Sequence, residues 1–173
     1  MVTVKEISKA FHVFYEGLRD PSFTKSLRLN EWTERDLLPL VRIFLLGWFG
    51  RGRVAPEIMS SLPGKSTGKG RLDFVVHGVA VELAVRCKGG ARSNLSAAVN
   101  ADEIKKLMKY DGRAILIPLD FTDDPLDDEA IHKFRNWPSL GIGPHKKSAF
   151  NVSHHYRDPE TALLVHHAIN VRV

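Results

Sequence analysis

The sequence contains a single cysteine, Cys87, among its 173 residues. One thiol excludes an internal disulfide and a zinc site built from cysteines of one chain, and it fits a reducing compartment. Long apolar runs are also missing, because the longest, 37–49, is interrupted by Pro39 and Arg42 and is too short to span a bilayer. The N-terminal segment lacks the apolar stretch of a signal peptide. We therefore expect a cytoplasmic protein with no membrane partner.

The composition is that of an ordinary globular protein, with 43% hydrophobic and 26% charged residues. This length predicts one domain covering residues 1–173. The net charge of +5 is uneven, because residues 131–173 hold six Lys and Arg against two Asp and Glu. A second basic group lies in the middle of the chain and comprises Arg51, Arg53, Lys65, Lys69 and Arg71. Such clusters suit a polyanion such as nucleic acid, and a solvated basic surface is the alternative.

Two helices are predicted in the first third of the chain. Residues 4–19 carry apolar side chains at helical spacing, and we expect Phe11, Phe14 and Tyr15 to pack inward, with a dimer contact as the alternative. Residues 34–49 form a second amphipathic segment, for which Thr33 and Asp36 provide a capping-box-like pattern. Pro39 within that segment predicts a kink or a later start.

Alternating and β-branched patterns predict strands at 53–60, 71–77, 79–86 and 113–121. A helix from Asn100 to Tyr110, with Glu103 completing a capping box, separates the last two. This order predicts an α/β protein with a mixed sheet, in which an antiparallel meander leads through a helical crossover to a parallel strand. Beyond residue 121 we expect a short helix near 127–136 and a C-terminal hairpin formed by 148–156 and 162–173.

The hairpin 71–88 carries two acids, Asp73 and Glu82, on strands joined at Gly78. Side chains alternate across a strand, so Glu82 lies opposite a wholly apolar face made by Val79, Val81, Leu83 and Val85. Two neighbouring carboxylates repel each other, and a divalent cation relieves that repulsion. Oxygen ligands favour Mg²⁺ or Mn²⁺. The alternative is a pair of salt bridges with nearby arginines.

The stretch Gly-Arg-Leu-Asp73-Phe-Val-Val followed by Val-Glu82-Leu-Ala84-Val-Arg86 resembles the PD-(D/E)xK nuclease superfamily, whose restriction-endonuclease-like core has the order αβββαβ. The resemblance covers residues 31–121, with an N-terminal helix in 1–30 and a C-terminal extension in 122–173. It implies that Asp73 and Glu82 hold the metal. It also implies a helix acid, for which Glu34 is our choice and Glu31 and Glu57 are competitors.

The resemblance fails at one position, because Ala84 stands where the family has its lysine. Three explanations compete. The role has moved to Arg86 or Lys88 on the same strand face, the protein is a non-catalytic relative, or a lysine was replaced deliberately to trap a complex. Arginine stays protonated and cannot act as a general base, although it can stabilise developing charge. Lys88 lies about 20 Å beyond Glu82 along an ideal strand and needs a bend to return.

These observations predict a metal-dependent phosphodiesterase acting on DNA, with Asp73, Glu82, Arg86 and Lys88 as its catalytic residues. Asp73, Glu82 and Glu34 would hold Mg²⁺ or Mn²⁺. The expected contacts to the nucleic-acid backbone are Lys65, Lys69, Arg71, Lys146 and Lys147. Many family members that cut duplex DNA are dimers, so a homodimer is expected as one form. The alternatives are a catalytically inactive nucleic-acid-binding protein and a dimeric interaction scaffold.

Two pairs of adjacent histidines, 154–155 and 166–167, lie in the predicted C-terminal hairpin. Neighbours on a strand point to opposite faces, so each pair offers one ligand to each face. This spacing matches no established zinc pattern, and we expect surface or packing histidines.

Overall fold

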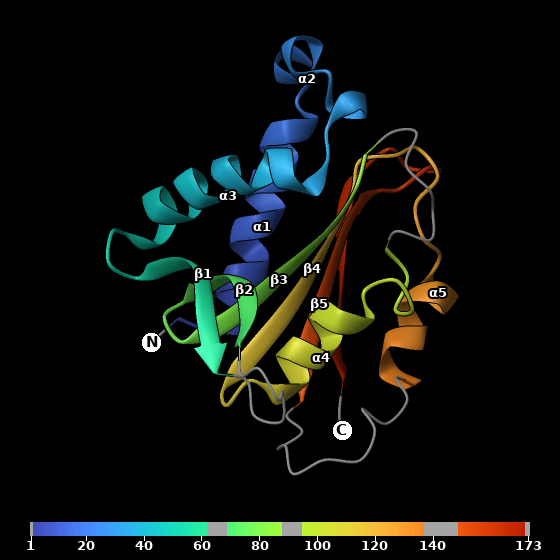
Figure 1. Cartoon of the computed structure of the whole chain (residues 1–173). Helices are drawn as coiled ribbons and strands as arrows, with labels where there is room; N and C mark the ends of the chain where they lie inside the picture. Colours follow the sequence, from blue (N-terminus) through green and yellow to red (C-terminus); the bar gives the residue numbers. More distant parts are fainter. Residues whose placement is uncertain (1, 62–68, 88–94, 137–148, 172–173) are drawn as a thin grey trace.

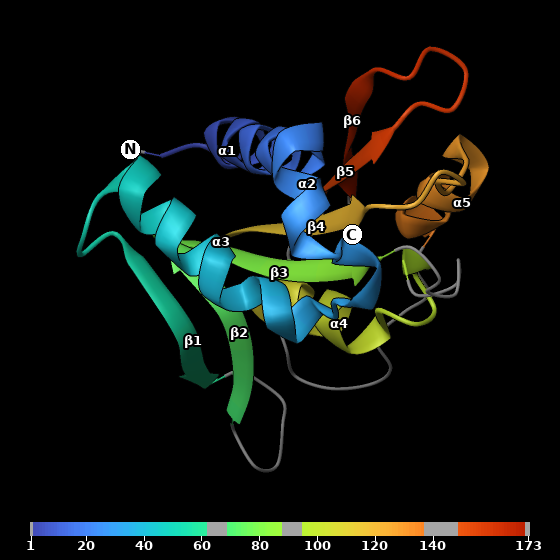
Figure 2. The same cartoon turned by 90° about the horizontal axis from the view of Figure 1, so that it is seen from above.

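The computed structural model describes residues 2–61, 69–87, 95–136 and 149–171, and it is an α/β protein built on a six-stranded mixed sheet. The strands are β1 (Val54–Ser61), β2 (Lys69–Val76), β3 (Val79–Arg86), β4 (Arg113–Asp120), β5 (Phe150–Arg157) and β6 (Leu164–Val171). Their order across the sheet follows their order in the chain. Helices cover both faces, with α1 and α3 on one side and α4 and α5 on the other (Figures 1 and 2).

The strand directions confirm the mixed sheet predicted from the sequence. β1, β2 and β3 form an antiparallel meander, and β3 pairs with β4 in parallel. The C-terminal strands β5 and β6 form the predicted antiparallel hairpin. The sequence did not reveal that β5 also pairs in parallel with β4, which joins the hairpin to the central sheet.

The helices follow the predicted boundaries closely, and they are α1 (Val4–Arg19), α3 (Glu34–Phe49), α4 (Ala101–Lys109) and α5 (Asp128–His132). The N-terminus of α3 has the predicted cap, since Asp36 accepts hydrogen bonds from the Thr33 amide at 2.8 Å and from the Thr33 hydroxyl at 2.7 Å. The helix starts at Glu34 and continues through Pro39, so the later start is wrong. Sequence patterns also missed α2 (Pro21–Leu27) and the 3₁₀ turn η1 (Leu29–Glu31), while η3 (Lys133–Asn136) extends α5.

The predicted capping box of α4 is wrong. The Asn100 side chain donates to the Ser96 carbonyl at 2.9 Å and does not cap the helix. Glu103 instead faces Lys106, with their charged groups 3.9 Å apart. Asn100 therefore stabilises the turn that precedes α4. Glu103, in the first turn of α4, is left to interact with Lys106.

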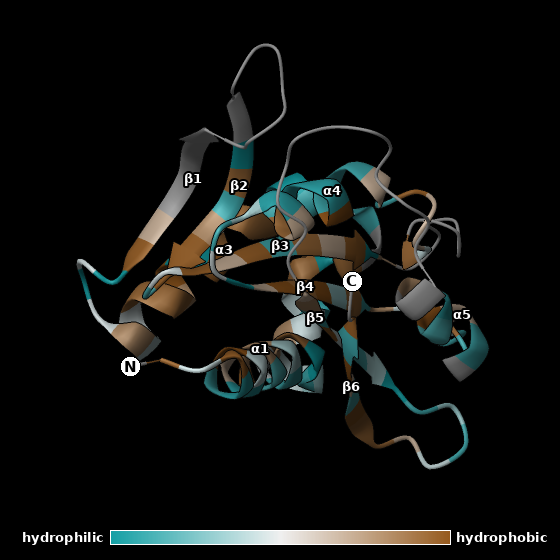
Figure 3. Ribbon diagram, turned by 90° about the horizontal axis from the view of Figure 1, so that it is seen from below, coloured by the Kyte–Doolittle hydropathy of each residue, from teal (hydrophilic) through white to brown (hydrophobic). Residues whose placement is uncertain are grey.

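Two apolar clusters sandwich the sheet (Figure 3). One lies beneath α1 and α3 and includes Phe11, Tyr15 and Leu45, which confirms inward packing of the first helix. The other lies beneath α4 and α5 and includes Ile104, Leu107 and Phe134. β4 is buried along almost its whole length, as expected for a central parallel strand covered on both faces.

The hairpin that joins β2 to β3 turns through His77 and Gly78, both with positive φ (49° and 78°), as a tight two-residue turn requires. The ladder between the strands runs only from Phe74 to Val76. Before Phe74 the β2 chain changes face, because Leu72 packs in the α4 cluster whereas Phe74 packs in the α3 cluster. β2 thus separates from β3 at Asp73, which opens the sheet at that point.

Candidate active site

Asp73 and Glu82 lie where β2 and β3 separate. Oδ2 of Asp73 accepts a hydrogen bond from the Leu83 amide at 2.8 Å, so this carboxylate takes up a strand donor beyond the end of the ladder. Asp73 is half-buried and Glu82 is only 1% exposed. The structure thus brings together the two acids that the sequence singled out, and it anchors one of them to the backbone that carries the other.

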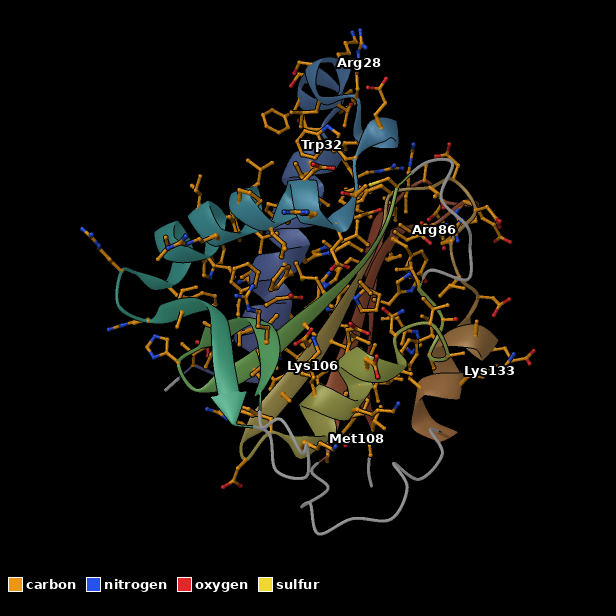
Figure 4. The ribbon with its side chains drawn as sticks, viewed as in Figure 1. Arg28, Trp32, Arg86, Lys106, Met108 and Lys133 are labelled. Atoms are coloured by element: carbon orange, nitrogen blue, oxygen red, sulfur yellow. The ribbon has the colours of Figure 1, made fainter. Side chains whose placement is uncertain are left out.

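Lys106 on α4 supplies the cation for this pair. Its Nζ donates to Oε2 of Glu82 at 2.7 Å and to the Arg71 carbonyl at 3.0 Å. Its third neighbour is Oε1 of Glu103, at 3.9 Å. Figure 4 shows Lys106 on α4, the helix that covers this face of the sheet. The alternative interpretation of Glu82, a cross-strand salt bridge with an arginine, is wrong in its partner, because the salt bridge is formed with a lysine from the crossover helix.

Glu34, the first residue of α3, is the third acid near this point. Burial, followed by the charges of Asp73 and Glu103, raises the pKa of Glu34 to about 7. The competing acid Glu31 instead forms an exposed ion pair with Arg28 at 3.7 Å. The side chain of Glu57 lies outside the described residues. Of the helix acids described, Glu34 is therefore the one that shares an electrostatic environment with Asp73.

Glu82 is in an unfavourable position for a lone carboxylate. Burial and the charge of Asp73 raise the pKa of Glu82 to about 8, although Lys106 acts in the opposite direction. Its Oε1 is buried and accepts no hydrogen bond from any residue that the structure describes. Burial alone would lower the pKa of Lys106, but Glu82 and Asp73 outweigh it and raise that pKa. We call Glu34, Asp73, Glu82 and Glu103 the acidic cluster, and it carries more negative charge than Lys106 can neutralise.

The acidic cluster fits a cation that is held by few protein ligands. The unpartnered Oε1 of Glu82 offers a buried oxygen ligand beside Asp73. Within the described part of the chain, no three His, Cys, Asp or Glu side chains converge closely enough to hold a metal ion. Mg²⁺ commonly binds through one or two carboxylates and completes its shell with water and substrate phosphate. The residues that could supply oxygen ligands to such an ion are Asp73 and Glu82, with Glu34 nearby.

Ala84 lies on the face of β3 that α4 covers, and its exposed fraction is 1%. It and Ala80 flank Glu82 on the same strand face and pack with Ile104 and Leu107 of the helix. Two methyl side chains let α4 approach β3 closely. The absence of a long side chain at position 84 thus leaves room for a helix that carries its own lysine to Glu82.

The two cations that the sequence favoured have other positions. Arg86 is buried at the far end of β3 (Figure 4), where its Nη1 lies 3.4 Å from Oδ2 of Asp120. Its Nη2 donates to the Thr122 hydroxyl at 2.6 Å and also to the Asp124 carbonyl. Lys88 lies outside the described residues. Arg86 therefore belongs to a separate buried network and does not contact the acidic cluster.

The expected phosphate contacts are described only in part. Lys65, Lys146 and Lys147 lie outside the described residues, as does the side chain of Lys69. Arg71 is exposed on β2, next to the point where Lys106 reaches its carbonyl. The part of the chain that can be described thus keeps one of the five predicted basic contacts beside the cluster.

Sequence analysis missed Lys106 and Glu103. Both lie on a predicted helix whose inward residues, Ile104, Leu107 and Met108, were identified correctly. The sequence feature that could have indicated them is the alanine at position 84. It leaves β3 without a lysine there, and its small side chain lets α4 pack closely on the strand. Periodicity gives the buried face of α4, but it does not show which strand residue that face meets.

The C-terminal histidines are packing residues in the described structure. His154 stacks on Tyr156 with ring centroids 4.7 Å apart, whereas His155 lies against His12 of α1 at 5.8 Å. Both are fully buried, and burial lowers the pKa of His154 to about 3. The expectation that neighbours point to opposite faces is confirmed. His166 reaches the same cluster as His155, at 5.6 Å between ring centroids.

Comparison with protein-family models, with curated proteins and with solved structures returned no match. Among the described residues, no helix has the length and apolarity needed to cross a membrane. The class that fold and site define is therefore an α/β protein with a buried Glu–Lys pair beside three further acids.

Proposed function

We propose that the protein is a metal-dependent phosphodiesterase that cleaves DNA, with Asp73 and Glu82 as metal ligands and Glu34 as an accessory acid. The observation that carries this proposal is the contact of Lys106 with Glu82, at 2.7 Å within a cluster of acids. The PD-(D/E)xK resemblance implies a lysine close to the metal-binding acids, where it positions or activates the attacking water. Here the lysine would come from α4 instead of from position 84. The order α3-β1-β2-β3-α4-β4 also agrees with the αβββαβ core of that superfamily.

Each residue would have a distinct task. Asp73 and Glu82 would supply oxygen ligands to the metal. Glu34 would accept a hydrogen bond from a water molecule bound in the cluster. A bound Mg²⁺ would lower the pKa of a water molecule and polarise the scissile phosphate. Lys106 would hold Glu82 in place and direct its remaining positive charge toward the phosphate in the transition state. Its raised pKa keeps it protonated, so it serves as an electrostatic group and not as a base.

Cleavage of duplex plasmid and of single-stranded circular DNA with Mn²⁺ or Mg²⁺ tests this proposal. We expect cleavage of at least one of the two that chelation abolishes and that Asp73→Ala and Glu82→Ala both lose. Calorimetric titration of Mn²⁺ into the same variants separates loss of metal binding from loss of chemistry. Absence of cleavage of any nucleic acid with any divalent cation would refute the enzyme.

The alternative functions have their own signatures in the same preparation. Salt-sensitive retention of DNA without cleavage would favour a binding protein that keeps the fold and lacks the chemistry. A stable dimer with neither activity would favour an interaction scaffold. The unpartnered Oε1 of Glu82 favours the enzyme, because a scaffold gains nothing from a buried acid that costs folding free energy.

A further inference from the structure

A groove of about 760 Å³ lies between α3 and β2 and reaches the acidic cluster. Asp73 forms one end of its lining, and Phe74 lies on its strand side. The helix side is lined by Leu38, Pro39, Arg42 and their neighbours. Its volume is within the ~300–1,000 Å³ typical of sites that enclose a small organic ligand. The groove is therefore continuous with the proposed catalytic residues and large enough to take part of the substrate.

The groove combines an apolar wall with one positive charge. Apart from Asp73 and Arg42, its described lining consists of hydrophobic side chains. Arg42 is exposed and forms no ion pair with any described residue. An exposed guanidinium over an apolar wall suits a ligand that is both anionic and aromatic, since arginine binds phosphate and also stacks on planar rings.

The helix geometry sets the distance between this charge and the acidic cluster. Glu34, Leu38 and Arg42 follow each other at intervals of four residues, so they lie on one face of α3. At 1.5 Å per residue, Arg42 is about 12 Å along the helix axis from Glu34. Stacked nucleotides advance by about 3.4 Å along one strand, so a strand held at the Glu34 end of α3 would reach Arg42 after a few nucleotides.

Building on the proposed function, we propose that this groove binds an unpaired stretch of DNA, with bases against the apolar wall and a phosphate on Arg42. A duplex stacks its bases and hides their faces, so it would present only backbone to this wall. An unpaired strand exposes faces that gain from apolar contact. The substrate class is therefore single-stranded DNA or a single-stranded flap.

The test compares a labelled single-stranded dodecamer with its blunt duplex, by fluorescence anisotropy in EDTA and by cleavage in Mn²⁺. We expect tighter binding and faster cleavage of the single strand. Arg42→Ala should weaken single-strand binding about tenfold and lower the slope of log K against log salt by about 0.7, the value for one lost phosphate contact. Arg42→Lys should keep the slope. The control is Arg113→Ala, which removes an exposed arginine that does not line this groove.

Substrate length gives a second readout. A stacked dinucleotide held at the Glu34 end of α3 spans less than the about 12 Å to Arg42, so Arg42→Ala should not change its affinity or its cleavage. If the Arg42→Ala penalty is the same for dinucleotide and dodecamer, the residue acts on folding or on the acidic cluster, and the inference is overturned.

The outcomes separate this inference from the nuclease proposal. Cleavage that favours duplex and is unaffected by Arg42→Ala would overturn the single-strand inference and leave the nuclease intact. Single-strand binding that depends on Arg42 without any cleavage would refute the nuclease and support the groove. A protein that neither binds nor cleaves either DNA would overturn both the groove inference and the nuclease proposal.

Discussion

The ammonium of Lys106 on α4 lies 2.7 Å from Oε2 of Glu82 on β3, across 24 residues of sequence. The lysine is 16% exposed and the glutamate 1%, so water screens this pair weakly. The contact gives Glu82 a cation that its own strand does not provide. It also makes the crossover helix part of the site, and three of the predictions below depend on the surroundings of this pair.

Replacing Lys106 should abolish most of the cleavage while the fold is retained. Removal of one preorganised cation typically costs about 10²–10³ in kcat. We expect Lys106→Ala to show a loss of that size, and Lys106→Arg, which keeps the charge, to show a smaller one. The measurement is the single-turnover rate of cleavage in Mn²⁺, with circular dichroism to confirm folding.

Lys105 is the matched control for this prediction. It lies on the same helix, is 43% exposed, and pairs with Asp102 at 3.4 Å away from the acidic cluster. Lys105→Ala should keep the wild-type rate. Equal losses in both variants, or a wild-type rate in Lys106→Ala, would remove Lys106 from the chemistry.

Glu82→Gln should stabilise the metal-free protein at alkaline pH. The pKa of Glu82 is raised from 4.5 to about 8, so between these values the folded state holds a proton that the unfolded chain has released. The free energy of unfolding therefore falls as pH rises through this window. Glutamine mimics the protonated acid, so we expect Glu82→Gln to exceed wild type by about 1–3 kcal/mol at pH 8.5.

Urea denaturation of both proteins from pH 4.5 to 8.5 measures this difference. It should shrink toward zero at the acid end, where Glu82 is protonated in the folded state and about half protonated in the unfolded chain. Other titrating groups are common to the two proteins and cancel. Saturating Mn²⁺ should stabilise wild type and not the variant, because only a carboxylate ligand gains from the cation. A difference that does not change with pH would mean that Glu82 is already neutralised by Lys106.

Local sequence signals were sufficient for most of the fold. Helical periodicity gave α1 and α3, and the two-residue turn at Gly78 gave the β2–β3 hairpin, because these elements depend on neighbours in the chain. The short helix α2 was missed, since its seven residues bury no side chain and carry no apolar stripe. The pairing of β5 with β4 was missed because it depends on contacts distant in sequence.

The residues of the candidate site were likewise predictable where they depend on neighbours in the chain, and not where they depend on distant contacts. Asp73 and Glu82 could be placed together because one tight hairpin carries both, and Glu34 because it begins the helix before the strands. Lys106 could not, because its partner depends on how closely α4 approaches β3. That approach depends on Ala80 and Ala84 as packing residues, whereas the motif treats position 84 only as a missing lysine.

Arg86 should prove to be a stability determinant. It is 3% exposed, and its ion-pair partner Asp120 is fully buried. Arg86→Met would leave Asp120 as an uncompensated buried charge, so we expect a loss of about 3–5 kcal/mol in the free energy of unfolding. Asp120→Asn removes this uncompensated charge, so in the Arg86→Met background it should recover part of that loss.

The readout that separates stability from chemistry is cleavage per folded molecule. At a temperature where Arg86→Met is still folded, its single-turnover rate should equal that of wild type. A variant with wild-type stability and no cleavage would instead support the catalytic role that the sequence suggested for Arg86.

His154 should make the protein sensitive to acid. Burial lowers its pKa from 6.5 to about 3, so the folded state excludes a proton that the unfolded chain binds below pH 6.5. Its contribution to stability is present above pH 6.5 and is lost progressively as pH falls toward 3. We expect His154→Phe, which removes this titration and keeps an aromatic ring beside Tyr156, to lose less Tm than wild type between pH 7 and 5. His132→Gln, at a half-buried site on α5, is the control and should follow wild type.

Restoring the motif lysine tests whether Lys106 and position 84 are alternative origins of one cation. Position 84 is buried among apolar side chains beneath α4, so Ala84→Lys alone would overpack the interface and place two ammonium groups beside Glu82. We expect it to cost about 1–3 kcal/mol of stability and to gain no cleavage. In Ala84→Lys/Lys106→Ala the helix lysine is gone and its space is free. The double variant should therefore be more stable than Ala84→Lys and should cleave faster than Lys106→Ala. If Ala84→Lys raises the rate of the otherwise wild-type protein, Lys106 does not supply the missing function, and the site is a degenerate one that a single residue repairs.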